Sequence, residues 1–460
     1  MLRIGRVTAK ATAACWLYLS CWNSLSLSTT SRIAVAAFAT TPSTSRSSPF
    51  SAFYRQSLAC TRTFAKMSSS ETNQTTAAET TTTTQSSSTA ATPPQVNLIE
   101  LAAAAVSCTV TAARSIRRIS GADAKNSRLK TDGSVVTDAD FCAQGVIFKA
   151  ITSVSSQVKI VGEESAEEMA RHTEIIIEED ADIRKRTLLE LRLRYHGKKM
   201  ERLPLAQTTE TDAERKPLSD ADTGEIDQLN DPEDCIVDAS RVIVIVDPLD
   251  GTKSYATGDY DCVSILIGIV LDNKPFFGVI GKPFGYTGVT SILDTGCATF
   301  YGGPMINGVY IAGGDAVIPT AIDASAAIED LPRAVISSSR SKGLVHDFCI
   351  HLGEQGLVYP EPMLISGAGE KSLRLILQRK NEALWFYPKA GTSLWDVAAP
   401  DALLRALGGK MSDKFGNDMD YSKNRDEAEN IDGVVACIDA KLHEKCIRLF
   451  QEGDWGDRIY

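Results

Sequence analysis

The stretch VIVIVDPLDGTKSY at residues 242–255 limits the possible folds of this chain more than any other feature of its sequence. Five consecutive β-branched residues predict a buried strand, and this strand runs directly into Asp247 and Asp250. A carboxylate at the end of a buried apolar run is costly unless another group compensates its charge. Because α/β proteins place their sites at the carboxyl ends of strands, we expect a sheet with a functional site at this strand end.

The residues DPLDGT can also be interpreted as a simple turn, since Asp, Pro and Gly all favour turns. Pro248, however, stiffens the loop, which allows the two carboxylates and the carbonyl group of Leu249 to converge on one point. The amides of Gly251 and Thr252 follow and offer N–H groups suited to a phosphate oxygen. Oxygen ligands without His or Cys indicate a hard cation such as Mg²⁺, so adjoining metal and phosphate sites are predicted.

Charge is distributed unevenly along the 460 residues. The first seventy residues contain no Asp or Glu but eight Lys or Arg, a composition typical of a targeting segment. Without them the chain has 40 basic and 58 acidic residues, a net charge near −18. A nucleic-acid partner is therefore not expected, because proteins that follow phosphate backbones need a basic face. An anionic substrate would require cations at the site.

The chain divides into segments of different composition and pattern. We predict a targeting presequence at 1–66, a low-complexity linker at 67–95, an N-terminal α+β metal-binding domain at 96–325 with a charged insertion at 166–240, and a C-terminal α/β domain at 326–460. The C-terminal assignment rests on strand and helix patterns that alternate after Pro332. The sequence indicates neither a role for the insertion nor an oligomeric state.

The presequence predicts an organellar protein. AVAAFATTP at 34–42 resembles the junction of bipartite plastid presequences, which favours a plastid over a mitochondrion, whereas a start at Met67 would give a cytoplasmic protein. Residues 12–28 are too short and too polar to span a bilayer, and no membrane partner is expected. The eight cysteines outside the presequence form no CxxC pair, which predicts reduced structural thiols rather than a zinc site.

Several motifs, in a fixed order, resemble those of a known family. DPLDGT, GEES at 162–165 and WDVAAPDALLRALGG at 395–409 resemble the magnesium-dependent, lithium-sensitive phosphatases of the inositol monophosphatase superfamily. SSSRS at 337–341 and GAGEK at 367–371 add similarity to its 3′(2′),5′-bisphosphate nucleotidases. The resemblance implies a layered αβαβα sandwich of the inositol monophosphatase and fructose-1,6-bisphosphatase type, with both α+β and α/β character.

The resemblance also implies a role for each acid. It implies two or three Mg²⁺ ions held by Glu163, Asp247, the carbonyl group of Leu249, Asp250 and Asp396. Considered alone, GEES would be a solvated surface and Asp396 a helix cap. Of the acids in KTDGSVVTDAD, the resemblance selects Asp140, which pairs with Thr252 to activate the attacking water. Helix capping is the alternative for Asp140.

For the substrate, the resemblance implies contacts from Gly251, Thr252, Ser339, Lys342, Gly367 and Lys371, with Arg340 as a further candidate. Lys342 replaces a His that is common in animal members, and Lys371 could instead be a solvated helix charge. The implied reaction removes the 3′-phosphate from 3′-phosphoadenosine 5′-phosphate to give AMP, by attack of a metal-activated water. 3′-Phosphoadenylyl sulfate is a second candidate substrate, so the expected partner is a small phosphorylated nucleotide.

Other functions stay open. An inositol polyphosphate 1-phosphatase or an inositol monophosphatase would use the same metals with a different pocket. A catalytically silent sensor of a bisphosphate nucleotide belongs to another class, but it has no need of a pair such as Asp140 and Thr252. Fructose-1,6-bisphosphatase activity is disfavoured by the motif spacing and by the lack of an Arg-rich pocket.

Overall fold

The structure is a computed structural model that describes most of the chain after residue 92. The described residues are 93–121, 127–130, 133–170, 179–202, 235–289, 293–294, 296–314, 316–319, 327–340 and 342–458, with backbone only for 198–202 and 340. The predicted presequence, most of the predicted linker, much of the predicted insertion and the predicted boundary at 325 lie outside these residues. The described residues all belong to one compact unit of the chain.

The larger sheet has six strands in the order β10-β9-β8-β7-β6-β4. The strands are β4 (Lys159–Gly162), β6 (Val242–Asp250), β7 (Ser264–Leu271), β8 (Lys274–Lys282), β9 (Ala298–Gly303) and β10 (Gly308–Ile311). β4 pairs with β6 in parallel, and the other pairs are antiparallel. The strand at the opening motif is therefore β6, which has a neighbour on both sides and is buried as its β-branched residues predict.

The second sheet has five strands in the order β12-β11-β13-β15-β14. The strands are β11 (Arg333–Ile336), β12 (Met363–Leu364), β13 (Glu382–Tyr387), β14 (Lys410–Ser412) and β15 (Val434–Cys437). Two short ribbons, β1 (Gln95–Asn97) with β5 (Ile236–Asp238) and β2 (Arg128–Leu129) with β3 (Val135–Val136), flank the described core.

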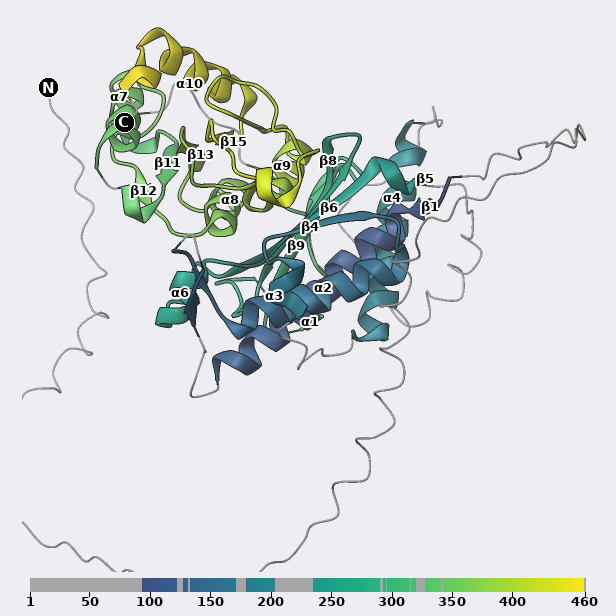
Figure 1. Cartoon of the computed structure of the whole chain (residues 1–460). Helices are drawn as coiled ribbons and strands as arrows, with labels where there is room; N and C mark the ends of the chain where they lie inside the picture. Colours follow the sequence, from purple (N-terminus) through teal and green to yellow (C-terminus); the bar gives the residue numbers. More distant parts are fainter. Residues whose placement is uncertain are drawn as a thin grey trace, which may run out of the picture. The chain divides into compact units, whose positions relative to one another are not determined.

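Helices and sheets alternate in five layers (Figure 1). The helices are α1 (Leu98–Ser120), α2 (Asp138–Val154), α3 (Ala166–Ala170), α4 (Ala181–Arg202), α6 (Thr252–Thr257), α7 (Leu344–Glu354), α8 (Ala368–Leu377), α9 (Leu394–Ala406) and α10 (Ala440–Glu452). α1 and α2 cover the outer face of the six-stranded sheet, α8 and α9 contact strands of both sheets, and α7 and α10 cover the far face of the second sheet. The predicted αβαβα sandwich is confirmed.

The hairpin of β7 and β8 turns at an Asp-Asn pair between two apolar runs, a pattern that predicts a tight turn. Asp272 and Asn273 connect the strands, and both have positive φ angles, 51° and 59°. Asn and Asp tolerate this conformation better than other residues with a side chain, and it matches the twist of the flanking strands. The hairpin places β7 directly beside β6 and its two acids.

α9 lies very close to the larger sheet because the facing strands carry glycine. A Cβ atom at Gly278 of β8 would lie 2.4 Å from the carbonyl oxygen of Ala399, and one at Gly268 of β7 would lie 2.6 Å from the Cβ of Ala398. Only glycine permits this approach of helix and strand. The close packing brings the N-terminal turn of α9, which carries Asp396, towards the larger sheet.

α1 is long and apolar enough by composition to cross a membrane, but 89% of its most apolar window is buried inside the protein. It packs against α2, α4 and the larger sheet, which accounts for its apolar residues. α4 shows where one part of the charged insertion lies. Arg194 of this helix donates to the buried Tyr301 hydroxyl at 3.1 Å, and its guanidinium lies 3.6 Å from the ring centre of Tyr310.

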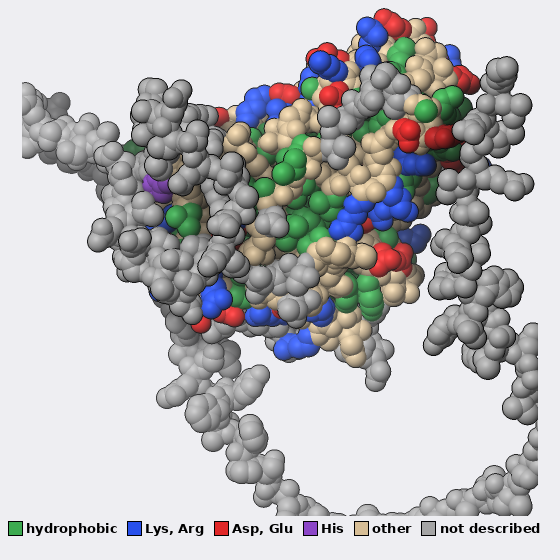
Figure 2. Space-filling view, turned by 180° about the vertical axis from the view of Figure 1, so that it is seen from behind, with side chains coloured by type: hydrophobic (Ala, Val, Ile, Leu, Met, Phe, Trp, Pro, Cys, Tyr) green, Lys and Arg blue, Asp and Glu red, His purple; other side chains and the backbone are tan. Residues whose placement is uncertain are grey.

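The surface carries both kinds of charge. Figure 2 shows Lys and Arg side chains interspersed with Asp and Glu side chains over the described part of one face. The eight described cysteines are free, and seven of them are buried. They behave as small apolar core residues, as the sequence predicts.

Candidate active site

The two acids at the end of β6 are held by different means. Asp247 is 2% exposed, and its Oδ1 accepts from the amide of Leu249 at 3.0 Å. Asp250 is 7% exposed, and its oxygens accept from the Ser264 hydroxyl at 2.7 Å and from two amides of α8. The ladder with β7 is irregular between the two acids, which turns both side chains towards one point. The carboxylates of Asp247 and Asp250 therefore lie close together, with ligand oxygens within 4.8 Å of each other.

Asp396 joins them from the other side. It is the third residue of α9, where its Oδ2 accepts from the amide of Ser393 at 2.6 Å in a capping box. Asp247, Asp250 and Asp396 each offer a carboxylate oxygen within 4.8 Å of the others. Asp396 thus caps its helix, as the alternative interpretation holds, and also adds a partly buried acid to the two buried acids of β6.

Burial raises the pKa values of these acids, and their mutual repulsion raises them further. The pKa of Asp396 rises to about 7 because of burial and the nearby charge of Asp250. That of Asp247 rises well above its usual value because of burial and the charges of Glu163, Asp250 and Asp396. A cation between these carboxylates would remove this unfavourable repulsion. The donor set, all oxygen and all acidic, fits a hard divalent cation.

Glu163 follows β4 and lies beside the end of β6, because its amide donates to the carbonyl oxygen of Val246 at 3.1 Å. Its carboxylate is paired with Lys130, 2.9 Å away, and does not belong to the closest group of three acids. Lys130 also contacts Glu164 at 2.7 Å, and the two glutamates raise the pKa of this lysine despite its burial. Lys130 therefore supplies a positive charge that sequence reasoning missed.

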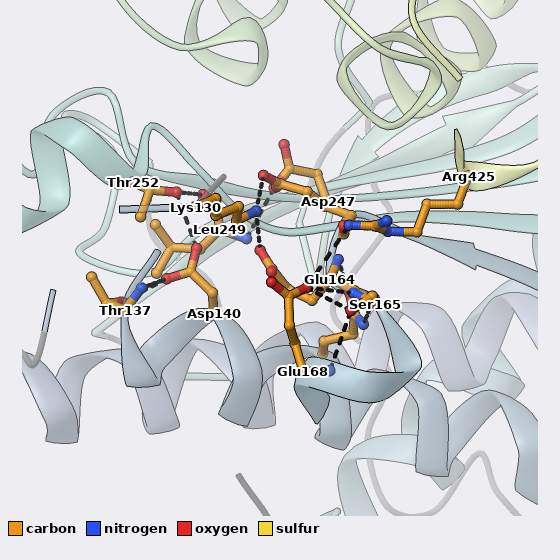
Figure 3. A network of polar contacts seen from close by, with 12 residues as sticks. Lys130, Thr137, Asp140, Glu164, Ser165, Glu168, Asp247, Leu249, Thr252 and Arg425 are labelled. Carbon is orange, nitrogen blue, oxygen red and sulfur yellow. Dashed lines mark hydrogen bonds and ion pairs between the residues drawn. The ribbon is translucent and has the colours of Figure 1, made fainter. Parts of the chain in front are cut away.

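Asp140 and Thr252 meet as predicted, from α2 and α6. The Thr252 hydroxyl lies 3.0 Å from Asp140 Oδ1 and 2.9 Å from the carbonyl oxygen of Leu249 (Figure 3). Asp140 Oδ2 accepts from the amide and the hydroxyl of Thr137, so that Asp140 also caps α2. Burial raises the pKa of Asp140 to about 7, although the hydrogen bonds from Thr137 oppose the rise.

The predicted substrate glycines allow close contacts between backbones. Gly251 has a φ of 84° and Gly367 a φ of 76°. A Cβ atom at Gly367 would lie 2.6 Å from the carbonyl oxygen of Cys262 and 3.1 Å from Asp250 Oδ2. Gly367 thus lets the start of α8 approach the acids, whatever its role towards a substrate.

The predicted substrate lysines differ in burial. Lys371 is 6% exposed, and its ammonium donates to the carbonyl oxygen of Gly367 at 2.7 Å, so it is not a solvated helix charge. Burial lowers the pKa of Lys371, and the charges of Asp250 and Asp396 oppose this effect. Lys342 is exposed.

The loop with the other predicted substrate residues lies next to the start of α8. Ser339 is exposed, and Ser338 of the same loop accepts from the Ser366 hydroxyl at 3.1 Å. The side chain of Arg340 lies outside the described part of the structure. The structure therefore brings the loop at 337–340 near Gly367, and it gives Lys342 no described partner of its own.

The contact of Thr137 with Asp140 agrees with the sequence, because Thr followed three residues later by Asp is a capping pattern. Sequence reasoning missed other residues that support the site. Ser264, Lys130 and Arg425 come from other segments and have no local pattern that links them to an acid. The Arg425 guanidinium donates through Nε to the carbonyl oxygen of Glu163 at 2.8 Å.

Comparisons with known proteins are consistent with this site. The model of the inositol monophosphatase family matches residues 198–454, which include β6 and α9. The 3′(2′),5′-bisphosphate nucleotidase 1 of Dictyostelium discoideum is 26% identical over 378 residues, 77% of this chain and 97% of the relative. The human protein of the same name is 32% identical over 209 residues, 43% of this chain and 58% of the relative.

More distant matches were also found. The human Golgi-resident adenosine 3′,5′-bisphosphate 3′-phosphatase is 27% identical over 216 residues, 46% of this chain and 52% of the relative. A solved inositol monophosphatase from Anabaena has a TM-score of 0.44 at 15% identity, over 77% of this chain and 96% of that one. The family model matches more than half of the chain, and the matched range includes Asp247, Asp250 and Asp396. The chain therefore belongs to the inositol monophosphatase family.

Proposed function

We propose that this protein is a Mg²⁺-dependent phosphomonoesterase that removes the 3′-phosphate from 3′-phosphoadenosine 5′-phosphate, giving AMP and phosphate. The observation that carries the proposal is the close group of Asp247, Asp250 and Asp396 together with the pair of Asp140 and Thr252. The names of the Dictyostelium and human relatives support the nucleotide substrate. 3′-Phosphoadenylyl sulfate, which carries the same 3′-phosphate, is a second substrate to test.

The groups that would hold Mg²⁺ are the carboxylates of Asp247, Asp250, Asp396 and Glu163 and the carbonyl oxygen of Leu249. Bound Mg²⁺ would supply positive charge that neutralises the phosphate and lowers the pKa of water. Glu163 would have to exchange its contact with Lys130 for the cation. The second partner of Lys130, Glu164, would then keep the lysine charge paired.

The pair of Asp140 and Thr252 would orient the attacking water. The Thr252 hydroxyl donates to Asp140 Oδ1, which leaves its oxygen lone pairs available to accept a hydrogen bond from water. The carboxylate is fixed because Thr137 occupies its other oxygen. Asp140 would also receive the proton that the water loses through the threonine.

The start of α8 and the loop at 337–340 would form the nucleotide side of the site. Lys371 is buried, so it would act by holding Gly367 rather than as an exposed contact. Ser339 and Lys342 are exposed and available to a substrate. The amides of Gly251 and Thr252 would contact the 3′-phosphate.

Inositol phosphates are the alternative class of substrate, because the matching family model is that of inositol monophosphatases. The test measures phosphate release by the full chain, with Mg²⁺, from four substrates: 3′-phosphoadenosine 5′-phosphate, inositol 1,4-bisphosphate, inositol 1-phosphate and fructose 1,6-bisphosphate. We expect the nucleotide to have the highest kcat/KM, and a preference for either inositol phosphate would favour the alternative. Nucleotide binding without any phosphate release would instead indicate a silent sensor.

Lithium provides a separate test of the metal site. The family resemblance leads us to propose that Li⁺ inhibits the enzyme, in competition with one of the Mg²⁺ ions. Phosphate release should fall as Li⁺ is raised to millimolar concentrations at fixed Mg²⁺. Full activity under those conditions would contradict lithium sensitivity without affecting the assignment of the reaction.

A further inference from the structure

Arg425 connects the C-terminal part of the chain to the loop that carries Glu163. It begins the short helix η5 (Arg425–Glu427), and its Nε donates to the carbonyl oxygen of Glu163 at 2.8 Å. Its Nη2 lies 3.9 Å from Glu168, whose carboxylate accepts from the amide and the hydroxyl of Ser165. Figure 3 shows the Arg425 side chain pointing from the C-terminal part towards this loop.

The segment that begins with Arg425 also holds the residues in front of α9. The carbonyl oxygen of Ala428 accepts from the amide of Leu394 at 2.9 Å, and the amide of Asn430 donates to the carbonyl oxygen of Thr392 at 2.8 Å. These bonds lie on both sides of Ser393, whose amide donates to Asp396. Ala428 and Asn430 are nearly fully buried, at 1% and 5% exposed.

A second contact, from β4, holds the residues that immediately precede Arg425. Lys159 of β4, four residues before Glu163, donates through Nζ to the carbonyl oxygens of Ser422 and Lys423, at 3.1 and 3.4 Å. The segment at 422–430 is therefore bonded to the strand and loop of Glu163 at one end and to the N-terminus of α9 at the other. Glu163 and Asp396, which are 233 residues apart in the sequence, share this one support.

We propose that Arg425 is a positioning residue that sets the separation of Glu163 from Asp396 and thereby tunes the affinity of the site for Mg²⁺. The inference rests on the metal ligands of the proposed function. Arg425 acts through the Glu163 backbone, and none of its described contacts is with a carboxylate oxygen of the proposed ligand set. Groups that orient metal ligands in this way commonly change metal affinity by 10- to 100-fold.

The direction in which Mg²⁺ affinity changes when Arg425 is replaced distinguishes a positioning role from a purely electrostatic one. Arg425 places a positive charge near acids that would bind a cation, so its charge alone opposes Mg²⁺ binding. If the charge were its only influence, removing it would tighten binding. If Arg425 positions Glu163, removing it will weaken binding in spite of the more negative site.

The experiment replaces Arg425 by Met, which keeps much of the aliphatic stem and removes the donors. Mg²⁺ binding to the full chain is measured without substrate, from the rise in melting temperature with Mg²⁺ concentration. We expect Arg425→Met to raise the apparent Kd for Mg²⁺ by on the order of 10-fold. The melting temperature without Mg²⁺ should stay close to that of the wild type, and phosphate release should recover at saturating Mg²⁺.

Arg448→Met is the matched control, since Arg448 is an exposed residue of α10 whose ion pair with Glu452 is 4.0 Å long. It should leave the Kd unchanged. An unchanged or lower Kd for Arg425→Met would overturn the inference, even if the melting temperature without Mg²⁺ fell. An equal rise in the Kd of the control variant would also overturn it. If the wild type itself fails to bind Mg²⁺, the proposed function fails together with the inference.

Discussion

Asp247 and Asp250 differ in how much of their charge the protein already compensates. Asp250 accepts three hydrogen bonds, so an Asn in its place would turn an amide group towards a donor. Among the described residues, Asp247 accepts one hydrogen bond, from the amide of Leu249, and Asn can keep it. A substitution at Asp247 therefore separates loss of charge from loss of structure better than one at Asp250.

Asp247→Asn should leave the protein folded and reduce its activity severely. Removing one of several repelling carboxylates should leave the free energy of unfolding without Mg²⁺ unchanged or higher. Loss of a metal ligand should cost several kcal/mol in the transition state, at least about 100-fold in kcat/KM. Asp272→Asn, in an exposed turn, is the control and should keep wild-type activity. Wild-type Mg²⁺-dependent turnover by Asp247→Asn would contradict the assignment.

Thr252→Val should affect the chemical step more than metal binding. The change removes the hydroxyl that links Asp140 to the proposed water, so we expect kcat to fall by on the order of 100-fold. The Mg²⁺ concentration at half-maximal rate should change little, and Thr252→Ser should keep most of the activity. Steady-state rates at several Mg²⁺ concentrations separate the two effects. A Val variant with normal kcat would remove Thr252 from the mechanism.

At the scale of elements, the position of α9 depends on two glycines of the neighbouring hairpin. Gly268 and Gly278 allow the helix backbone to lie against β7 and β8, and Asp396 is at the N-terminal turn of this helix. The position of Asp396 thus depends on contacts of the next helical turn, at Ala398 and Ala399. A side chain at either glycine would have to move the helix or the sheet.

Gly278→Ala should destabilise the protein by about 1–3 kcal/mol, because its Cβ would lie 2.4 Å from the carbonyl oxygen of Ala399. It should also raise the Mg²⁺ concentration needed for activity, since α9 carries Asp396. Gly197→Ala in α4 is the control, since nothing lies within 4 Å of its Cβ position. Helix propensity predicts that this control is neutral or more stable by up to about 1 kcal/mol. Urea unfolding of both variants would test the prediction, and equal stabilities would contradict it.

At the scale of the whole molecule, buried polar contacts join the larger sheet to α8, which lies between the two sheets. The Lys282 ammonium of β8 donates to Glu370 of α8 at 2.9 Å, and both side chains are buried. Asp250 accepts from the amides of Ala368 and Gly369 at the start of the same helix. The layers are therefore connected beside the acids, and a change in protonation can affect the stability of the whole unit.

His443 should make the protein less stable in mild acid. Its pKa is lowered to about 4 by burial and by the nearby charge of Lys410, whereas an unfolded His has a pKa near 6.5. Between these values the unfolded chain binds a proton that the folded chain does not, so the free energy of unfolding falls as pH falls from about 6.5 to 4. The maximum effect is about 3 kcal/mol.

The acids of the site act in the opposite sense, because their raised pKa values favour the folded state as pH falls. The test therefore compares wild type with His443→Gln, which cannot titrate but can still form a hydrogen bond with Ser412, whose hydroxyl lies 2.8 Å from the ring nitrogen Nε2. The unfolding free energy of the wild type minus that of His443→Gln should become smaller as pH falls from about 6.5 to 4. Only the wild type loses stability through protonation of His443 in the unfolded chain. A difference that does not depend on pH would contradict the shift.

The sequence predicted the elements whose signals are local. The β-branched run predicted β6, the Asp-Asn pair predicted the hairpin of β7 and β8, and the acid before VAAPDALL predicted the start of α9. It did not predict that Lys130 would pair with Glu163, or that Arg425 would support the loop of that residue. Such partners lie far apart in the chain, and charged residues that meet only after folding leave no periodic pattern.

Metal binding by the acids at the end of β6 can be tested directly in crystals grown with Mn²⁺ as a substitute for Mg²⁺. Diffraction recorded near the manganese absorption edge locates the ions without reference to activity. The account predicts an anomalous peak in contact with carboxylate oxygens of Asp247, Asp250 and Asp396. The Mn²⁺ concentration in the crystal must be one that supports phosphate release. The account would be contradicted if the three side chains were ordered but no peak lay between them.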